Sequence, residues 1–373
     1  MKIGLGLYRQ SLTPDNFQFA AQAGATHIVA HMTNYFAGKD PAISRGDDVD
    51  GWGDCSQDRL WTEEDLSALV RTIRAAGLEL AGLENFSPKF WSDILLDGPE
   101  RPAQLEGMKQ LIRNAGRAGV PCIGYNFSIA GVWGWQRGPL ARGKAQSVGF
   151  DASRIDPNLP LPDGLVWNMR YRPARSDAKP VTVSDDELWQ RLTHFLLEMV
   201  PVAEEAGVVL AAHPDDPPME SLRGAARLVN RPEKYDRLLD IVDSPFNAVE
   251  LCLGSLQEMP GGEIYSHIRR FARADRIGYI HFRNVRGKVP NYVETFVDDG
   301  DIDMAEVVRI LRDESYEGVL IPDHTPGMTC AASWHAGMAF ALGYMRALVQ
   351  NAGSLGPSWS RATPTMAVEQ GRP

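Results

Sequence analysis

Apolar stretches of strand length alternate with segments of helical spacing along nearly the whole sequence. Eight such stretches are expected to be strands, at residues 3–8, 27–32, 78–84, 122–127, 208–213, 248–253, 277–282 and 319–323. Eight segments with helical spacing follow them, at residues 14–23, 63–76, 102–118, 185–207, 233–242, 264–273, 304–313 and 334–350. Eight strand–helix units predict an α/β fold, a (β/α)8 TIM barrel, with an open doubly wound sheet as the alternative.

Polar and glycine residues mark the expected helix ends. Thr62 and Ser184 each precede a run of acidic residues and are expected to cap helices, because their hydroxyls can accept a hydrogen bond from the first turn. Gly77, Gly119 and Gly207 stand where three helices should stop. These signals support the positions of the predicted helices.

The composition argues against nucleic acid and membranes as partners. The 373 residues carry 38 basic and 48 acidic side chains, a formal charge of -10, and no basic run, which argues against nucleic acid as a partner. Four scattered cysteines, at positions 55, 122, 252 and 330, predict no disulfide framework. With no secretory leader and no apolar stretch near 20 residues, the sequence predicts a soluble cytoplasmic protein that does not enter a membrane.

One barrel domain is expected over residues 1–350, interrupted by loops on one face. Residues 131–182 are rich in Trp, Gly, Pro and Arg, show little periodicity, and follow the fourth strand, so we interpret them as an active-site insertion or lid without regular structure. A smaller insertion, residues 286–298, follows the seventh strand. The tail, residues 351–373, is expected to be loose.

Four metal-ligand residue types end four successive predicted strands: His213, Cys252, His281 and Asp323. A lone cysteine or histidine at a strand end is usually structural, but a series of four is not expected by chance. In a parallel barrel these strand ends meet at one rim. Imidazole, thiolate and carboxylate ligands suit a divalent transition metal, so the sequence predicts a single mononuclear site.

Five motifs resemble the mannonate dehydratases of hexuronate breakdown, a family of xylose-isomerase-like barrels. The similarity covers about residues 80–350 and rests on residues 125–127 (YNF), 213–218 (HPDDPP), 252–255 (CLGS), 281–285 (HFRNV) and 322–324 (PDH). The resemblance implies a hydro-lyase with His213, Cys252, His281 and Asp323 as ligands of a divalent metal. Manganese is the usual metal of the family, and iron, cobalt, nickel and zinc are alternatives.

The resemblance also implies that His324 acts as a catalytic acid or base. The sequence departs from the family in its N-terminal segment through Trp61 and after His324, where Met338 stands near the position of a tyrosine in typical members. These departures concern the substrate and leave the four ligand positions intact.

Dehydration of a sugar acid requires cations beside the carboxylate, because removing the neighbouring proton creates a dianionic enediolate. Arg283, two residues after His281, is expected to clamp that carboxylate through paired hydrogen bonds. Other polar residues at the strand ends are expected to contact substrate: Glu84, Tyr125, Asn126, Asp215 and Asn284. His31, Trp133 and Trp135 are further candidates for the cavity wall, with a structural role as the equal alternative.

Two other functions remain open at this point. A metal-dependent sugar isomerase or epimerase on the same scaffold could use Glu250, two residues from Cys252 on the same strand face, as a ligand. A non-catalytic sugar-binding barrel with a structural metal is the second alternative. A homo-oligomer is expected only by analogy with other barrels.

Overall fold

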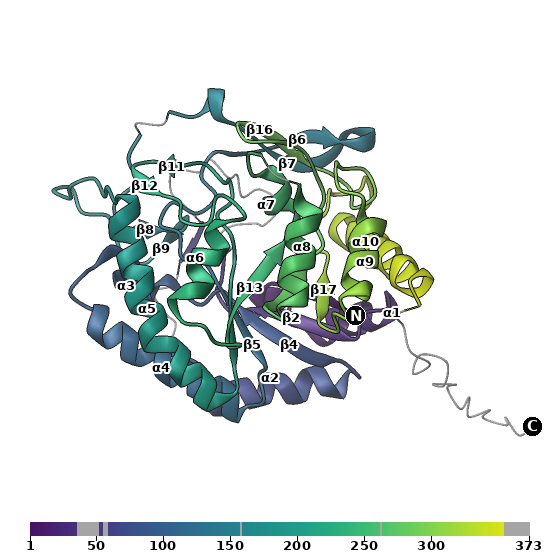
Figure 1. The fold of residues 1–373 in the computed structure, drawn as a ribbon, viewed down its shortest axis with the longest axis horizontal. Helices are drawn as coiled ribbons and strands as arrows, with labels where there is room; N and C mark the ends of the chain where they lie inside the picture. Colours follow the sequence, from purple (N-terminus) through teal and green to yellow (C-terminus); the bar gives the residue numbers. More distant parts are fainter. Residues whose placement is uncertain (36–51, 55–58, 157–158, 262, 354–373) are drawn as a thin grey trace, which may run out of the picture.

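The computed structural model describes residues 1–35, 52–54, 59–156, 159–261 and 263–353. Eight parallel strands close into a barrel in the order β1–β17–β14–β13–β10–β5–β4–β2 (Figure 1). Their bounds are β1 Lys2–Leu7, β2 His27–His31, β4 Glu79–Glu84, β5 Cys122–Tyr125, β10 Val209–Ala212, β13 Asn247–Cys252, β14 Ile277–His281 and β17 Val319–Ile321. The (β/α)8 prediction is confirmed, and the doubly wound alternative is wrong because the sheet has no open edge.

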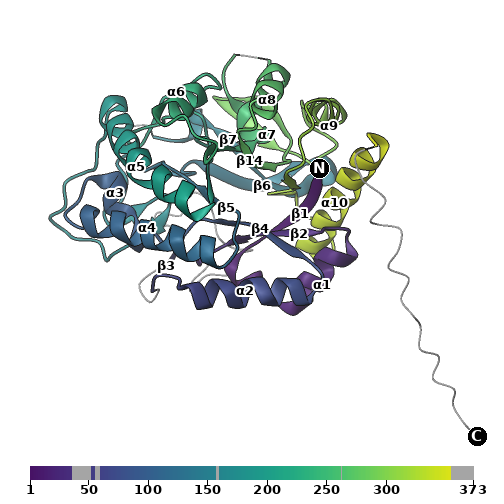
Figure 2. The same ribbon diagram turned by 60° about the horizontal axis from the view of Figure 1, so that its bottom comes forward.

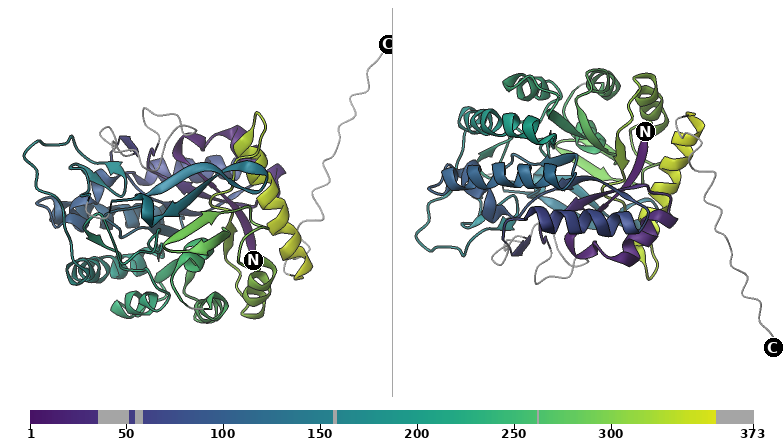
Figure 3. Two further views of the ribbon diagram at one scale, coloured as in Figure 1. Left: turned by 90° about the horizontal axis from the view of Figure 1, so that it is seen from above. Right: turned by 90° about the horizontal axis from the view of Figure 1, so that it is seen from below.

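Helices surround the barrel, as Figure 2 and the views in Figure 3 show. They are α1 Pro14–Gln22, α2 Glu63–Ala75, α3 Ser92–Leu96, α4 Arg101–Arg117, α5 Asp185–Ala206, α6 Lys234–Ile241, α7 Leu253–Glu258, α8 Ile264–Arg273, α9 Met304–Asp313 and α10 Ser333–Asn351. Short 3-10 helices occupy Arg9–Ser11, Pro88–Phe90, Arg142–Lys144 and Ala152–Arg154. Thr62 and Ser184 form capping boxes at α2 and α5, and Gly207 ends α5 in the left-handed region, as predicted.

Side chains alternate between the inside of the barrel and the layer under the helices. Hydrophobic side chains fill the interior, where Ala211, Tyr279 and Ile321 pack together. Gly124 is also inward-facing, since a Cβ there would meet the Tyr279 hydroxyl. Alternate residues of a strand face the same side, so the residue two positions after an inward-facing one also faces inward, nearer the mouth. His213 follows Ala211 in this way, and His281 follows Tyr279.

The insertions are more regular than predicted. Within residues 131–182, β6 (Trp135–Ala141) and β7 (Ala145–Asp151) form a hairpin, which joins β15 (Val285–Lys288) and β16 (Asn291–Glu294) in a sheet ordered β15–β16–β7–β6. We call this four-stranded sheet the roof; Figure 1 shows it at one end of the barrel. The expectation of a stretch without regular structure is wrong: Gly138 and a register shift before Ala141 disguise the strand alternation of β6.

Among the described residues, two small sheets complete the insertions. The short strand β9 (Met169–Arg170) pairs with β3 (Trp52–Asp54) on one side and with β8 (Leu165–Val166) on the other, and β11 (Ser221–Leu222) pairs with β12 (Ala225–Ala226). The predicted loose tail falls almost entirely on residues 354–373, outside the described residues. Among the described helices, none combines the length and apolar character that crossing a bilayer requires.

Candidate active site

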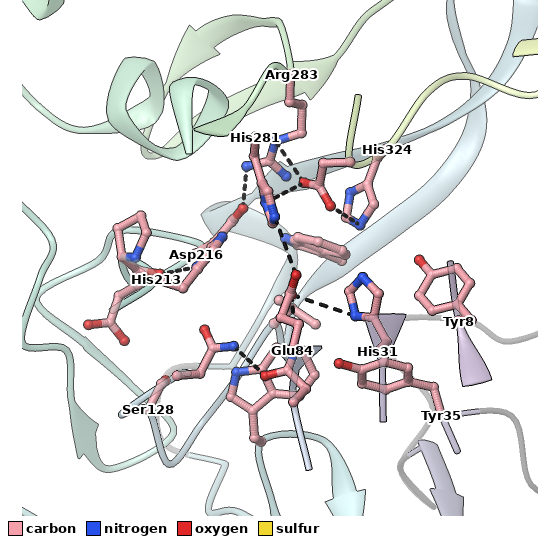
Figure 4. A pocket seen from close by; sticks show the side chains of 18 of the residues that line it. Tyr8, His31, Tyr35, Glu84, Ser128, His213, Asp216, His281, Arg283 and His324 are labelled. Atoms are coloured by element: carbon pink, nitrogen blue, oxygen red, sulfur yellow. Dashed lines mark hydrogen bonds and ion pairs between the residues drawn. The ribbon is translucent and has the colours of Figure 1, made fainter. Parts of the chain in front are cut away.

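A cavity opens at the carboxyl ends of the barrel strands, beneath the roof. Residues that follow β1, β2, β4, β5, β10, β14 and β17 line it, together with Trp135 and Arg137 of β6. In Figure 4, Tyr8, His31 and Tyr35 lie together on one side, while His281, Arg283 and His324 lie on another. This is the face on which barrels of this type carry their active sites.

Three of the four predicted metal ligands converge tightly. One ligand atom each from His213, Cys252 and His281 lies within 4.8 Å of the others, and the two imidazole rings are 5.3 Å apart. Asp323 joins them, with its Oδ2 atom 3.2 Å from Nδ1 of His281. Because strands β10, β13, β14 and β17 are consecutive in the barrel, their ends bring residues 110 positions apart in sequence to one point.

The environment of Cys252 favours the thiolate, which is the form that binds metals. Burial raises the pKa of this thiol, but the positive charge of Arg283 and hydrogen bonds with His213 and His281 outweigh burial, so the pKa lies well below its ordinary value. The backbone N–H and the hydroxyl of Ser255 also approach Sγ, at 3.5 and 3.3 Å. The donor set of two imidazoles, a thiolate and a carboxylate fits a divalent transition metal.

Glu250 belongs to a second group of possible metal ligands. One ligand atom each from Glu84, Glu250 and His281 also lies within 4.8 Å of the others, and Oε1 of Glu250 is 2.9 Å from Nε2 of His281. Glu250 is fully buried, and burial together with the charge of Glu84 raises its pKa. Glu250, like Cys252, is not among the residues that line the cavity, and its contact with Nε2 of His281 can orient that ring.

His324 lies at the edge of the cavity with an acidic partner on each side. Its Nδ1 atom is 3.1 Å from Oε1 of Glu294, and its Nε2 atom is 3.6 Å from Oδ1 of Asp323. Burial lowers the pKa of His324, but the two carboxylates outweigh it and raise the pKa above its ordinary value. The ring of Trp135 meets the imidazole edge-on at 5.5 Å, which fixes the side chain beside the cavity.

Arg283 lines the cavity, but its guanidinium is already engaged. Its side chain is 2% exposed; Nη1 donates to Glu294 at 2.7 Å and Nη2 donates to Asp216 at 2.5 Å. Nη2 also contacts Ser255 at 2.9 Å and Glu258 at 3.2 Å. Both terminal nitrogens are therefore engaged within the protein, which argues against the predicted clamp on a substrate carboxylate.

Two of the predicted substrate contacts, Tyr125 and Asn284, do not line the cavity. The ring of Tyr125 packs against Phe195 of α5 at 5.5 Å, because Gly124 takes the inward position of β5 and its neighbour must face the helices. Asn284 donates to the carbonyls of Val297 and Ile302 at 3.1 and 3.0 Å and holds the loop after β14, away from the cavity. These residues have structural roles.

The other predicted contacts lie at the cavity. Glu84, Asn126 and Asp215 all line it. Glu84 accepts a hydrogen bond from the Tyr279 hydroxyl at 3.1 Å, and Asn126 donates to Asn85 at 2.9 Å. His31 and Trp135, two of the further candidates, also line the cavity, whereas Trp133 does not. Met338 is buried within α10.

Sequence reasoning missed several cavity residues. Tyr8 directly follows β1, and alternation from Gly4 and Gly6 places it inward, a signal the sequence did contain. Tyr35, Arg137 and Arg227 carried no such signal, because each comes from an insertion or loop whose path depends on tertiary pairing. Glu294, the partner of His324, comes from the roof for the same reason.

Comparison with known proteins agrees with this geometry. The family model described as D-mannonate dehydratase matches residues 20–350. The chain belongs to the D-mannonate dehydratase family. A mannonate dehydratase of Streptococcus equi subsp. zooepidemicus is 33% identical over 284 residues, 71% of this chain and 75% of that protein. One from Thermotoga neapolitana is 34% identical over 287 residues, 71% of this chain and 78% of that protein.

Solved structures extend the similarity to the fold. The crystal structure of mannonate dehydratase from Streptococcus suis serotype 2 has a TM-score of 0.73 and 26% identity, covering 94% of this chain and 95% of that chain. A D-psicose 3-epimerase from Clostridium cellulolyticum H10 has a TM-score of 0.56 and 14% identity, covering 94% of this chain and 99% of that chain. The second similarity concerns the barrel alone.

Proposed function

We propose that this member of the D-mannonate dehydratase family is a hydro-lyase that converts D-mannonate to 2-keto-3-deoxy-D-gluconate and water. The observation that carries the proposal is the convergence of His213, Cys252 and His281 beside Asp323, at a cavity that His213, His281, Asp323 and His324 line. The relatives that match this chain are named mannonate dehydratases. The substrate follows from those names, and the chemistry follows from the residues.

His213, Cys252, His281 and Asp323 would hold a divalent metal, with Mn²⁺ as the proposed ion. When bound, such an ion stabilises the negative charge that develops on the carboxylate side of the substrate. The family and the ligand types support a divalent metal in general. Fe²⁺, Co²⁺, Ni²⁺ and Zn²⁺ would suit the same donors.

His324 moves a proton to or from the substrate. The reaction breaks a C–H bond next to the carboxylate and expels a hydroxyl one carbon away, so one group must accept a proton and another must deliver one. His324 lines the cavity, and Glu294 fixes its Nδ1 side at 3.1 Å. This leaves the Nε2 side, 3.6 Å from Asp323, for exchange with the substrate.

Glu84, Asn126 and Asp215 are proposed to recognise the sugar hydroxyls. All three present oxygen or amide groups at the cavity wall. Asp215 is itself positioned, since its Oδ2 accepts a hydrogen bond from the backbone of Val229 at 2.9 Å. Fixed acceptors of this kind distinguish one hydroxyl configuration from another, because an unmatched buried polar group is costly.

A cytoplasmic location and a homo-oligomeric assembly are also proposed, on the composition and on the analogy with other barrels. Size-exclusion chromatography with light scattering gives the oligomeric state. A mass equal to one chain would contradict the assembly and would leave the proposed activity untouched.

The deciding experiment is a screen of sugar acids with added Mn²⁺, scoring formation of a 2-keto-3-deoxy product. We expect turnover of D-mannonate that stops when the metal is chelated and returns when Mn²⁺ is restored. Turnover of only another aldonate would contradict the proposed substrate while keeping the reaction. Interconversion of ketoses without loss of water, dependent on Glu250 rather than Cys252, would support an isomerase or epimerase instead.

A further inference from the structure

The cavity contains three arginines, and two of them are committed to the protein. Arg283 is held by buried carboxylates, as described above. Arg227 is fully buried; Nη1 donates to Ser128 at 2.9 Å and to the carbonyl of Gly131 at 2.6 Å, while Nη2 donates to the carbonyl of Pro217 at 3.0 Å. The Nε atom of Arg227 lies 3.2 Å from Asp215. Both terminal nitrogens of each guanidinium are therefore engaged within the protein.

Arg137 differs from both. It lies on β6 of the roof opposite Val148 of β7, it is exposed, and it lines the cavity. Within the described part of the chain, no carboxylate or carbonyl accepts a hydrogen bond or forms an ion pair with its guanidinium. Arg137 is therefore a cation at the cavity whose donors remain available.

The geometry of β6 places Arg137 on the same face of the strand as Trp135, which contacts His324. Trp135 and Arg137 share one face of β6, about 7 Å apart along the strand, and Trp135 meets the ring of His324 at 5.5 Å. Arg137 also acts electrostatically on Tyr8, which lines the same cavity: burial raises the pKa of that phenol, and the positive charge of Arg137 opposes the rise. Arg137 and Tyr8 thus line one cavity, from the roof and from the end of β1.

We propose that Arg137 binds the carboxylate of the sugar acid, the role that the sequence suggested for Arg283. The inference rests on the proposed function, because it assumes an aldonate substrate. A guanidinium with free donors can hold a carboxylate through two parallel hydrogen bonds, a geometry that a lysine ammonium cannot reproduce. Since the carboxylate is the only charge on such a substrate, Arg137 selects sugar acids over neutral polyols of the same length.

The test compares Arg137→Gln and Arg137→Lys with Lys144→Gln. Lys144 is an exposed cation in the turn of the same hairpin and lies outside the cavity wall, so it controls for loss of roof charge. Metal-loaded proteins are assayed for kcat and KM with D-mannonate, and its binding is measured by calorimetry. D-mannitol serves as an uncharged competitor.

We expect Arg137→Gln to raise KM and Kd for D-mannonate about 10- to 100-fold, with the Ki for D-mannitol unchanged. Arg137→Lys should recover only part of the affinity, and Lys144→Gln should behave as wild type. Values of KM and Kd for Arg137→Gln within twofold of wild type would overturn the proposal, as would equal weakening of D-mannitol.

Failure of the proposed function gives a different result. If the wild-type protein binds D-mannonate or D-gluconate without forming a keto product, the dehydratase reaction is contradicted. The Arg137 proposal is then decided by binding alone: a 10- to 100-fold loss of aldonate affinity in Arg137→Gln supports it, and an unchanged affinity overturns it.

Discussion

Arginine has different surroundings in two regions of the cavity: the buried network of Arg283, Asp216 and Glu258, which we call the floor, and the roof. On the floor, Arg283 is buried at 2% exposure and its terminal nitrogens contact three carboxylates, from Asp216, Glu258 and Glu294. In the roof, Arg137 is exposed and lacks a partner among the described residues. A buried charge needs an opposite charge within the protein, because its desolvation is costly. A charge at an open mouth is solvated and can remain unpaired until a ligand binds. The difference separates a residue that organises the site from one that recognises an anion.

The two regions are also joined. Tyr292 of β16 donates to Oδ1 of Asp216 at 2.6 Å and accepts from the indole N–H of Trp135 at 3.1 Å. Asp216 in turn holds Arg283. The roof strands therefore help to fix the charge network of the floor, and substitutions can show whether the two regions act separately or together.

The largest effect is expected at His324, where floor and roof meet. His324→Asn keeps a polar side chain but removes the group that exchanges a proton, so kcat should fall by roughly 100- to 10,000-fold. The Kd for Mn²⁺ and the KM should change little, because the metal ligands are intact. Steady-state kinetics and a metal titration measure these quantities. A loss of metal binding equal to the loss of kcat would mean that His324 acts as a ligand.

Arg283→Met tests whether the floor arginine is structural. Removing a buried cation leaves Asp216, Glu258 and Glu294 close together without compensation, so the free energy of unfolding should drop by about 3–5 kcal/mol. Urea denaturation measures it. Arg286→Met is the control: Arg286 pairs with Asp299 at 3.1 Å in an exposed bridge, so its loss should cost less than about 1 kcal/mol. If the two variants are equally stable and only the KM of Arg283→Met is raised, the result would support Arg283 as the residue that binds the substrate carboxylate.

The smallest effect is expected at the link between the regions. Tyr292→Phe removes the hydrogen bond to Asp216 and should lower the free energy of unfolding by about 1.5–3 kcal/mol, because the acceptor is charged and buried. Tyr316→Phe is a matched control, since its hydroxyl donates only to the carbonyl of Val319, at 3.4 Å. A Tyr292→Phe protein as stable as the control would show that roof and floor are uncoupled.

The fold was predictable from the sequence because each strand–helix unit carries its own signals. Capping residues such as Thr62 and Ser184 and the glycine after α5 act locally, so their effect does not depend on the rest of the chain. The meeting of His213, Cys252, His281 and Asp323 was predictable because a parallel barrel places all strand ends at one rim. Their role as ligands remains a prediction.

Other features of the site were not predictable. Tyr125 was assigned to the wrong face because barrel strands are apolar on both sides, which hides the inward register. The ion pairs of Arg283 with Glu258 of α7 and Glu294 of β16 form only when these elements pack together, which the sequence does not indicate. The position of Arg137 was not predictable for two reasons. Gly138 and a register shift interrupt the alternation that would identify β6 as a strand, and β7 pairs with β16, which is more than a hundred residues away in sequence.

The most direct test of the metal site uses Co²⁺ as a spectroscopic substitute. Cobalt bound by a thiolate gives a sulfur-to-metal charge-transfer absorption that nitrogen and oxygen ligands alone do not give. We predict this band in Co²⁺-loaded wild type and in Glu250→Gln, and its loss in Cys252→Ser together with weaker metal binding. A wild-type complex without the band, or a Cys252→Ser protein that binds metal as tightly as wild type while Glu250→Gln does not, would contradict the account.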